Sequence, residues 1–162
     1  MKMKLGIYEL EVDAERTRQF YQQNGNISCT CNGCQNFAVA ISQLPEHVKE
    51  FLNQFGIDPA KPAELSAVYA PSDDTVFYDG FYHICGTILE GTTPYIQIGK
   101  KQFQLDTKYS IELDAENSVF FSNDVHLLDD NFPKPVFQLN IFFTLPWVLP
   151  KANTYNYQKE LP

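Results

Sequence analysis

The alternation of apolar and polar residues between positions 137 and 145 most constrains the fold. Every second side chain in this stretch is apolar, and the residues between them include Gln138, Asn140 and Thr144. Successive side chains of a β-strand point to opposite faces of a sheet, so this pattern predicts a central strand with one fully apolar face. The other face should be partly wet or line a groove. The apolar positions are Phe137, Leu139, Ile141, Phe143 and Leu145.

The N-terminal part of the chain carries helical periodicity instead. Apolar residues recur at i, i+3, i+4 and i+7 after Pro45, and Gly56 can end the helix that they predict. Asp13 can cap an earlier helix that runs to about Gln23. We also expect a short helix over residues 63–69. The apolar positions of the clearest helix are Val48, Phe51, Leu52 and Phe55.

The character of the sequence changes to β after residue 71. Residues 76–90 form a long aromatic stretch typical of a strand, and residues 95–98 and 102–105 alternate as in a hairpin. Two shorter strands are predicted over residues 109–113 and 118–121.

These elements predict an α+β fold in a single domain, residues 1–162. A helical half, about 1–70, would pack on an antiparallel β-sheet in a β half, about 71–150, with the sheet forming a sandwich or a partly closed barrel. We favour one domain because each half alone is small for a stable core. The polar tail, residues 151–162, should be loosely held.

Three of the four cysteines lie within six residues, at Cys29, Cys31 and Cys34. Side chains two apart in an extended segment point to the same side, and Gly33 allows a tight turn with a positive φ. Cys34 also falls on the apolar stripe of a helix predicted to run to Leu44, so its sulfur should face inward. The three sulfurs can therefore converge on one metal ion, and short thiolate clusters of this kind fit zinc best.

A closed zinc site needs a fourth ligand from elsewhere in the chain. Cys85 is the leading candidate, followed by His83 and then His47. A bond to Cys85 would tie the helical half to the β half. The predicted metal ligands are Cys29, Cys31, Cys34 and Cys85.

Three other interpretations of the cysteines are open. They can be small semi-buried thiols, because free cysteine is among the most buried residue types. Cys31 and Cys34 can form a redox pair, since a helix N-terminus lowers a thiol pKa, although a thioredoxin-like pair normally follows a strand. An iron–sulfur cluster with Cys85 as its fourth ligand is the least favoured of the three.

Two windows combine carboxylates with a histidine, as acid–base or metal chemistry requires. No spacing rule links the members of either window, and the second does not match a calcium-binding loop. We therefore interpret both as acidic turns. The first window holds Asp73, Asp74, Asp79 and His83, and the second holds Asp124, His126, Asp129 and Asp130.

The chain carries a net charge of −8. Nucleic-acid binding requires a basic face, and an anionic membrane repels an acidic one, so neither is a predicted partner. Residues 106–130 alone contain seven acids and one lysine. Such a surface is more often solvated than functional, but it can dock a basic protein partner by electrostatic attraction.

The sequence shows no secretory signal, because the few apolar residues after Lys4 are soon followed by Glu9 and Glu11. The longest apolar run, residues 141–149, is interrupted by Pro146 and is too short to span a bilayer. We expect a cytoplasmic protein, whose thiols would be reduced or metal-bound rather than paired in disulfides.

Three stretches together form a recognisable pattern: Cys29-x-Cys31-x-x-Cys34-x-Asn36-Phe37, Phe51-Leu52-x-x-Phe55-Gly56-Ile57-Asp58-Pro59-x-Lys61-Pro62 and Tyr78-x-Gly80-x-Tyr82-His83-x-x-Gly86. This pattern resembles a family of small bacterial proteins to which no function is assigned. The resemblance covers about a third to a half of the chain and implies a bacterial, cytoplasmic setting. It carries no catalytic residue over to this sequence.

The favoured functional hypothesis is a zinc-stapled, non-enzymatic binding protein with an acidic surface. The first alternative is a metal-dependent enzyme with an open cysteine-ligated zinc, a bound water and a nearby acid such as Asp79 or Glu90. The second is a thiol redox protein using Cys31 and Cys34. We favour a non-enzymatic role because the sequence contains no phosphate-binding glycine loop, nucleophile elbow or His-Glu-x-x-His motif.

Overall fold

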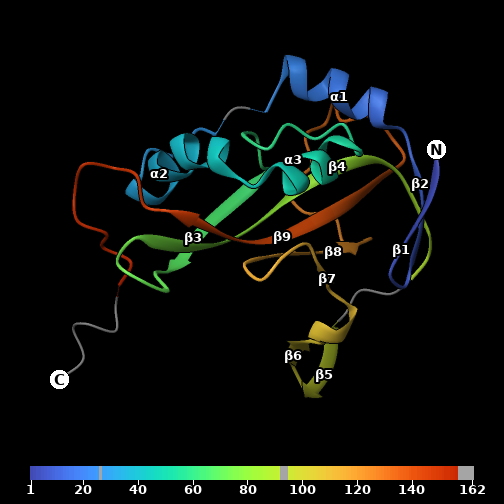
Figure 1. Cartoon of the computed structure of the whole chain (residues 1–162). Helices are drawn as coiled ribbons and strands as arrows, with labels where there is room; N and C mark the ends of the chain where they lie inside the picture. The colour runs from blue at the N-terminus through green and yellow to red at the C-terminus, as the bar shows by residue number, and fades with distance from the viewer. Residues whose placement is uncertain (26, 92–94, 157–162) are drawn as a thin grey trace.

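A computed structural model describes residues 1–25, 27–91 and 95–156. Within these ranges the chain forms three α-helices, a seven-stranded antiparallel sheet and a separate two-stranded hairpin, which confirms the α+β prediction (Figure 1). The helices are α1 (Ala14–Gln23), α2 (Asn32–Ala40) and α3 (Glu46–Asn53). The strands are β1 (Lys2–Leu5), β2 (Tyr8–Val12), β3 (Glu64–Tyr69), β4 (Thr75–Glu90), β5 (Tyr95–Gly99), β6 (Gln102–Leu105), β7 (Ile111–Glu112), β8 (Asn117–Ser122) and β9 (Val136–Pro146).

The pair β4 and β9 forms the middle of the large sheet, whose strand order is β1-β2-β4-β9-β8-β7 with β3 also paired to β4. The register of this pair is unbroken from Thr75 opposite Pro146 to Cys85 opposite Val136. β8 lies on the other edge of β9. The predicted central strand is therefore confirmed, and its regular register with β4 and β8 fixes which side chains of these three strands share a face.

The two faces of this sheet differ in what covers them. The three helices lie on one face (Figure 1), where alternate residues of β4, β8 and β9 form the apolar core. Tyr78 and Phe143 of this face are fully buried, and the Tyr78 ring packs against Phe37 of α2 with 5.3 Å between ring centroids. The opposite face, which we call the open face, carries the intervening residues, including Gln138 and Asn140.

The predicted helical half does not exist as a unit, because strands from both ends of the chain join the same sheet. β1 and β2 come from the first 12 residues, and β2 pairs with the end of β4. Residues 63–69 were predicted to be helical but form strand β3, which pairs with residues 77–81 of β4. Alanine, leucine and glutamate favour helices locally, but the open hydrogen-bonding edge of β4 overrides that preference.

The predicted closure into a partly closed barrel is wrong, because β1 and β7 remain at the two ends of the strand order. The hairpin of β5 and β6 forms its own small sheet and extends away from the large one (Figure 1). Helix α1 fills a gap on the β4 edge between β3 and β2. Its Tyr21 hydroxyl donates to the His83 carbonyl and accepts from the His83 N–H, both at 3.0 Å, and the Thr17 hydroxyl accepts from the Cys85 N–H at 2.9 Å.

The first part of the C-terminal tail is anchored rather than loosely held as predicted. The Lys151 ammonium donates to Asn32 Oδ1 at 3.0 Å, and the Tyr155 carbonyl accepts from the Ala70 N–H at 3.0 Å. Asn153 donates to the carbonyls of Asp73 and Thr75. These bonds hold the tail beside α2 and β3, while residues 157–162, which the same prediction included, lie outside the described ranges.

Candidate metal centre

The start of α2 brings the three neighbouring cysteines together. Cys31 is the N-cap residue with extended backbone angles, and its sulfur accepts from the Cys34 N–H at 3.5 Å. Cys34 follows in the first helical turn and is buried, as its place on the apolar stripe predicted. Cys29 lies two residues before the cap, on the same side as Cys31, with 3.2 Å between the two sulfurs. We call Cys29, Cys31 and Cys34 the triad.

The spacing of the triad sulfurs suits a single metal ion, because all three lie within 4.8 Å of one another. Zinc–sulfur bonds of 2.3 Å at tetrahedral angles place two sulfurs about 3.8 Å apart. The Cys29 and Cys31 sulfurs are 3.2 Å apart and no two triad sulfurs are more than 4.8 Å apart, so the spacing is compatible with that value. The predicted convergence of the sulfurs is therefore confirmed, and small rotations of side chains would complete a trigonal set of ligands.

The three thiols differ in acidity. Hydrogen bonds from the Cys34 N–H and from the Cys29 side chain lower the pKa of Cys31. Burial, followed by the neighbouring Cys29 and Cys31, raises the pKa of Cys34 to about 12. A metal ion would replace these protons, since thiolates rather than thiols are the ligands. Metal binding at the triad is therefore expected to release protons.

One side of the triad is open to a hollow of about 270 Å³ beside the start of β3. Cys29 and Cys34 line it together with Ser28, Pro62 and Leu65. Cys29 and Cys31 are themselves exposed. A metal held by the triad would thus have a fourth position that solvent or another molecule can reach.

Two tyrosines form hydrogen bonds with the backbone N–H and carbonyl of Gly33. The Tyr155 hydroxyl accepts from the Gly33 N–H at 3.0 Å, and the Tyr78 hydroxyl donates to the Gly33 carbonyl at 2.8 Å. The predicted positive φ at Gly33 is wrong, because Gly33 lies inside α2 with an ordinary helical φ. Close packing explains the glycine instead, since a Cβ there would lie 2.6 Å from the Ala67 Cβ.

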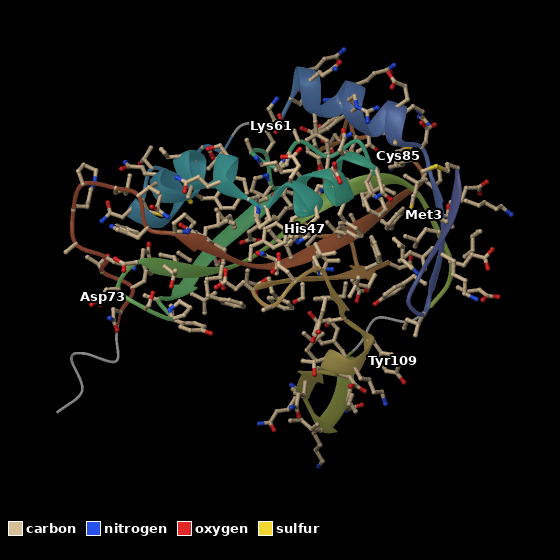
Figure 2. The ribbon with its side chains drawn as sticks, viewed as in Figure 1. Met3, His47, Lys61, Asp73, Cys85 and Tyr109 are labelled. Carbon is tan, nitrogen blue, oxygen red and sulfur yellow. The ribbon has the colours of Figure 1, made fainter. Side chains whose placement is uncertain are left out.

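The structure does not bring Cys85 to the triad. Cys85 lies in β4 beside the first turn of α1, at the opposite end of the helical layer from α2 (Figure 2). Burial raises the pKa of its thiol. The sequence predicted a strand around Cys85, and β4 confirms it. Nothing in the local sequence indicates which other segment of the chain lies beside Cys85 in this 16-residue strand.

The two histidines considered as fourth ligands are also engaged elsewhere. His83 is buried under the loop before β9, where its Nε2 lies 2.8 Å from the His126 carbonyl. His47 Nε2 lies 2.9 Å from Asp114 Oδ2. Among the histidines, cysteines and acids that the structure describes, the group able to share one ion contains the triad alone. Asp79 and Glu90, considered as the nearby acid of an open zinc enzyme, do not belong to this group of possible ligands.

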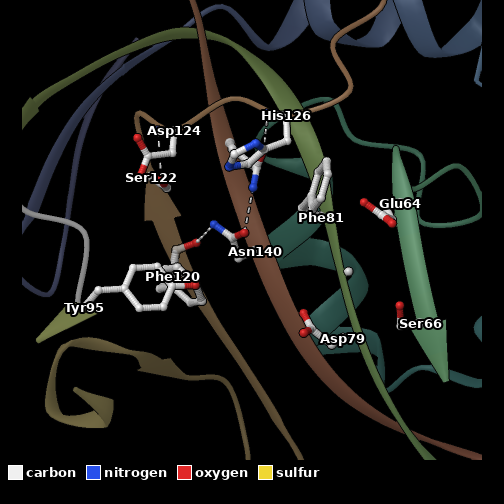
Figure 3. Close-up of a pocket in the computed structure, with 12 residues that line it drawn as sticks. Glu64, Ser66, Asp79, Phe81, Tyr95, Phe120, Ser122, Asp124, His126 and Asn140 are labelled. Carbon is white, nitrogen blue, oxygen red and sulfur yellow. Dashed lines mark hydrogen bonds between the residues drawn. The ribbon is translucent and has the colours of Figure 1, made fainter. Parts of the chain in front are cut away.

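The two acidic windows contribute to one cavity that their separate sequence patterns did not reveal. Asp79 from the first window and Asp124 and His126 from the second line a cavity of about 340 Å³ on the open face (Figure 3). Gln138 and Asn140 line it too, which confirms that the polar face of β9 borders a groove. The register of β4, β8 and β9 brings the strand residues together, and hydrogen bonds from the Asp124 N–H to Ser122 Oγ and from the His126 N–H to Gln138 Oε1 hold the loop after β8 beside them.

Comparison with known proteins gives no match to a family model, a curated protein or a solved structure. The likeness to small bacterial proteins therefore stays a prediction from the sequence pattern. Within the described ranges, no helix is both long enough and apolar enough to cross a membrane.

Proposed function

We propose that this chain is a zinc-binding, non-enzymatic binding protein whose triad of Cys29, Cys31 and Cys34 holds the metal. The convergence of three sulfurs within 4.8 Å at one helix start carries the proposal. Thiolate ligands and sulfur spacings close to a tetrahedral edge favour zinc over hard cations such as magnesium or calcium. A four-cysteine iron–sulfur cluster is less well supported, since Cys85 lies at another site.

The zinc would organise the start of α2 rather than join two halves of the chain. All three ligands belong to residues 29–34, and Gly33 between them is bonded to Tyr78 of β4 and to Tyr155 of the tail. Fixing this loop would therefore stabilise the packing of α2 against the tail and the sheet. The fourth ligand would be water or a group from a bound molecule.

The open face supports the second part of the proposal, a basic protein as partner. Its acids include Glu112, Asp114 and Glu116 around a second hollow of about 540 Å³, next to exposed aromatic residues such as Tyr69. Acidic and aromatic groups together attract basic partners and supply apolar contact area. This face carries none of the triad cysteines.

Metal analysis of untagged protein tests the zinc site. Native mass spectrometry should detect about one zinc per chain in the wild type and none in Cys31→Ser. Cys85→Ser is the matched control, because it also removes a thiol but leaves the triad intact. Absence of metal from protein purified under reducing conditions without chelator would contradict the proposal, as would equal zinc loss in the two variants.

A second function, thiol–disulfide exchange, is favoured by one observation. Cys31 combines an exposed position at a helix N-terminus with a lowered pKa, while Cys34, three residues on, is buried. An exposed attacking thiol and a buried resolving thiol are typical of redox pairs. Cys29→Ser distinguishes the two functions: it removes a zinc ligand but should leave a reversible Cys31–Cys34 disulfide measurable in glutathione buffers.

A further inference from the structure

Side chains from several strands form the floor and the walls of the cavity of about 340 Å³ on the open face. It lies on the face of the sheet away from the helices, partly beneath Tyr95 at the start of the β5–β6 hairpin (Figure 3). Its volume falls in the range of about 300–1,000 Å³ that is usual for small-molecule sites. We call it the open-face cavity.

Strand register places the cavity residues in two neighbouring rows across the sheet. One row runs from Phe120 through Asn140 and Phe81 to Glu64, and each member lies opposite the next on the adjacent strand. In the next row on the same face, Asp79 lies opposite Ser66 of β3. Four strands thus contribute to one surface, and their hydrogen bonds hold its groups in fixed relative positions.

The floor contains two buried amides with hydrogen-bonding capacity to spare. Gln138 is 3% exposed and Asn140 9% exposed. Gln138 Nε2 donates to Asn140 Oδ1 at 2.8 Å, and Gln138 Oε1 accepts from the His126 N–H at 3.1 Å. Asn140 Nδ2 has two N–H groups but, in the described structure, one contact, 3.5 Å from the Phe120 carbonyl, at the outer limit of a hydrogen bond.

Both amides meet the usual standard for buried polar groups, which nearly always have at least one hydrogen-bond partner. The Phe120 carbonyl of β8 and the His126 N–H orient the pair, and Asn140 lies at the cavity floor (Figure 3). The second N–H of Asn140 Nδ2 leaves capacity for a ligand oxygen as acceptor.

The walls are acidic on both sides and lack a neutralising cation. Glu64 and Asp79 lie on the β3–β4 side and Asp124 on the β8 side (Figure 3), and neither lysine nor arginine is among the described lining residues. Tyr95 adds exposed ring surface and packs against the buried Phe120, with 5.7 Å between the ring centroids. Carboxylates beside aromatic rings attract an ammonium group through charge and through the negative ring faces.

The described wall carboxylates do not form a three-ligand site for a bare metal ion. Of the described acids, cysteines and histidines, the three wall carboxylates do not come close enough together to share one ion. They surround a volume instead, so an extended organic cation can meet one carboxylate with its charged end while other atoms reach the amides.

We propose that the open-face cavity binds a small organic cation that carries a primary ammonium group and at least one oxygen acceptor, the class that includes amino alcohols and amino sugars. The ammonium group lies between Glu64 and Asp79, the oxygen accepts from Asn140 Nδ2, and the carbon skeleton packs against Tyr95. This site goes beyond the proposed zinc function and does not depend on it, because no triad sulfur lines the cavity.

Isothermal titration calorimetry with three matched probes tests the proposal at about pH 7. Glucosamine carries both the ammonium group and oxygens, glucose lacks the ammonium group, and cyclohexylamine lacks the oxygens. We expect glucosamine to bind one per chain, at least about tenfold more tightly than either other probe. Equal binding of glucose or of cyclohexylamine would overturn the proposal, as would no heat from glucosamine up to about 10 mM.

Charge-neutral variants locate the site. The double variant Glu64→Gln with Asp79→Asn should weaken glucosamine binding by at least about tenfold. Glu50→Gln, which removes one exposed carboxylate on α3, should leave it unchanged. Thermal unfolding of each variant establishes that it is folded. Unchanged binding in the double variant, or an equal loss in Glu50→Gln, would show that the probe binds elsewhere and would refute the assignment.

Discussion

The triad and the open-face cavity are assembled in opposite ways. The triad takes all its ligands from residues 29–34, and the geometry of one helix start brings them together. The cavity draws on β3, β4, β8 and β9, on the loop after β8 and on the first residue of a separate hairpin, and its lining residues run from Glu64 to Asn140 in the sequence. A local site depends on the turn that forms it, whereas a site across a sheet depends on the register of every strand beneath it.

The largest expected effect tests how far the two regions share a core. Ile141 of β9 is fully buried on the helix-facing side of the sheet. Ile141→Ala should lower the free energy of unfolding by about 2–5 kcal/mol, since it removes buried carbon atoms and leaves a cavity. Urea denaturation measures this loss. Zinc stoichiometry should stay unchanged in the folded variant, and its loss would show that the triad is not locally assembled.

Removal of zinc should have the next largest effect. A metal at about 100 to 1,000 times its dissociation constant stabilises the folded state by about 2.7–4.1 kcal/mol. For a chain of 162 residues this corresponds to a fall in Tm of about 5–16 °C after chelation. Differential scanning calorimetry with and without chelator measures it. Cys31→Ser serves as the control, because its Tm should not respond to the chelator.

The sequence predicted the local region better than the distributed one, and the reason is physical. Helix α1 with its Asp13 cap, the restart of a helix after Pro45 and the inward position of Cys34 all follow from contacts within a few residues. The pairing of β3 with β4, and the position of Cys85 beside α1, depend on which segments meet in space.

The cavity illustrates the same limit. The alternation in β9 predicted that the face of Gln138 and Asn140 is partly wet or lines a groove, and both side chains line the cavity. Asp79 and Asp124 fall in separate sequence windows, each typical of an acidic turn. They face one volume because of the register of β4, β8 and β9 and the path of the loop after β8.

Gly33→Ala tests whether the triad depends on close packing of α2 against β3. The new Cβ would lie 2.6 Å from the Ala67 Cβ and 2.7 Å from the Tyr155 hydroxyl oxygen. Forcing this contact should cost about 1–3 kcal/mol of stability and weaken zinc binding, because the helix start must shift. Urea denaturation and zinc titration measure the two effects. Adding Ala67→Gly should restore part of both, and no restoration would refute the packing argument.

The smallest effect concerns the wall of the open-face cavity, where a charge is expected to lower stability. Partial burial, followed by the nearby Glu64, raises the pKa of Asp79. The folded state therefore binds this proton more tightly than the unfolded state, and stability falls as the pH rises through the folded pKa. Asp79→Asn should raise Tm at neutral pH by about 1–3 °C, and the gain should vanish at a pH low enough to protonate the carboxyl in both states.

Asp114 provides the matched comparison, because its pKa is shifted the other way. Its partial burial acts upward, but hydrogen bonds from the Asn117 side chain and the Glu116 N–H lower the pKa overall. Its carboxylate stabilises the folded state above the unfolded pKa, and this stability is lost as the pH falls through the folded pKa. Asp114→Asn should thus lower Tm at neutral pH. If Asp79→Asn lowers Tm as Asp114→Asn does, Asp79 is not held at a cost to stability, as a preformed cation site would require.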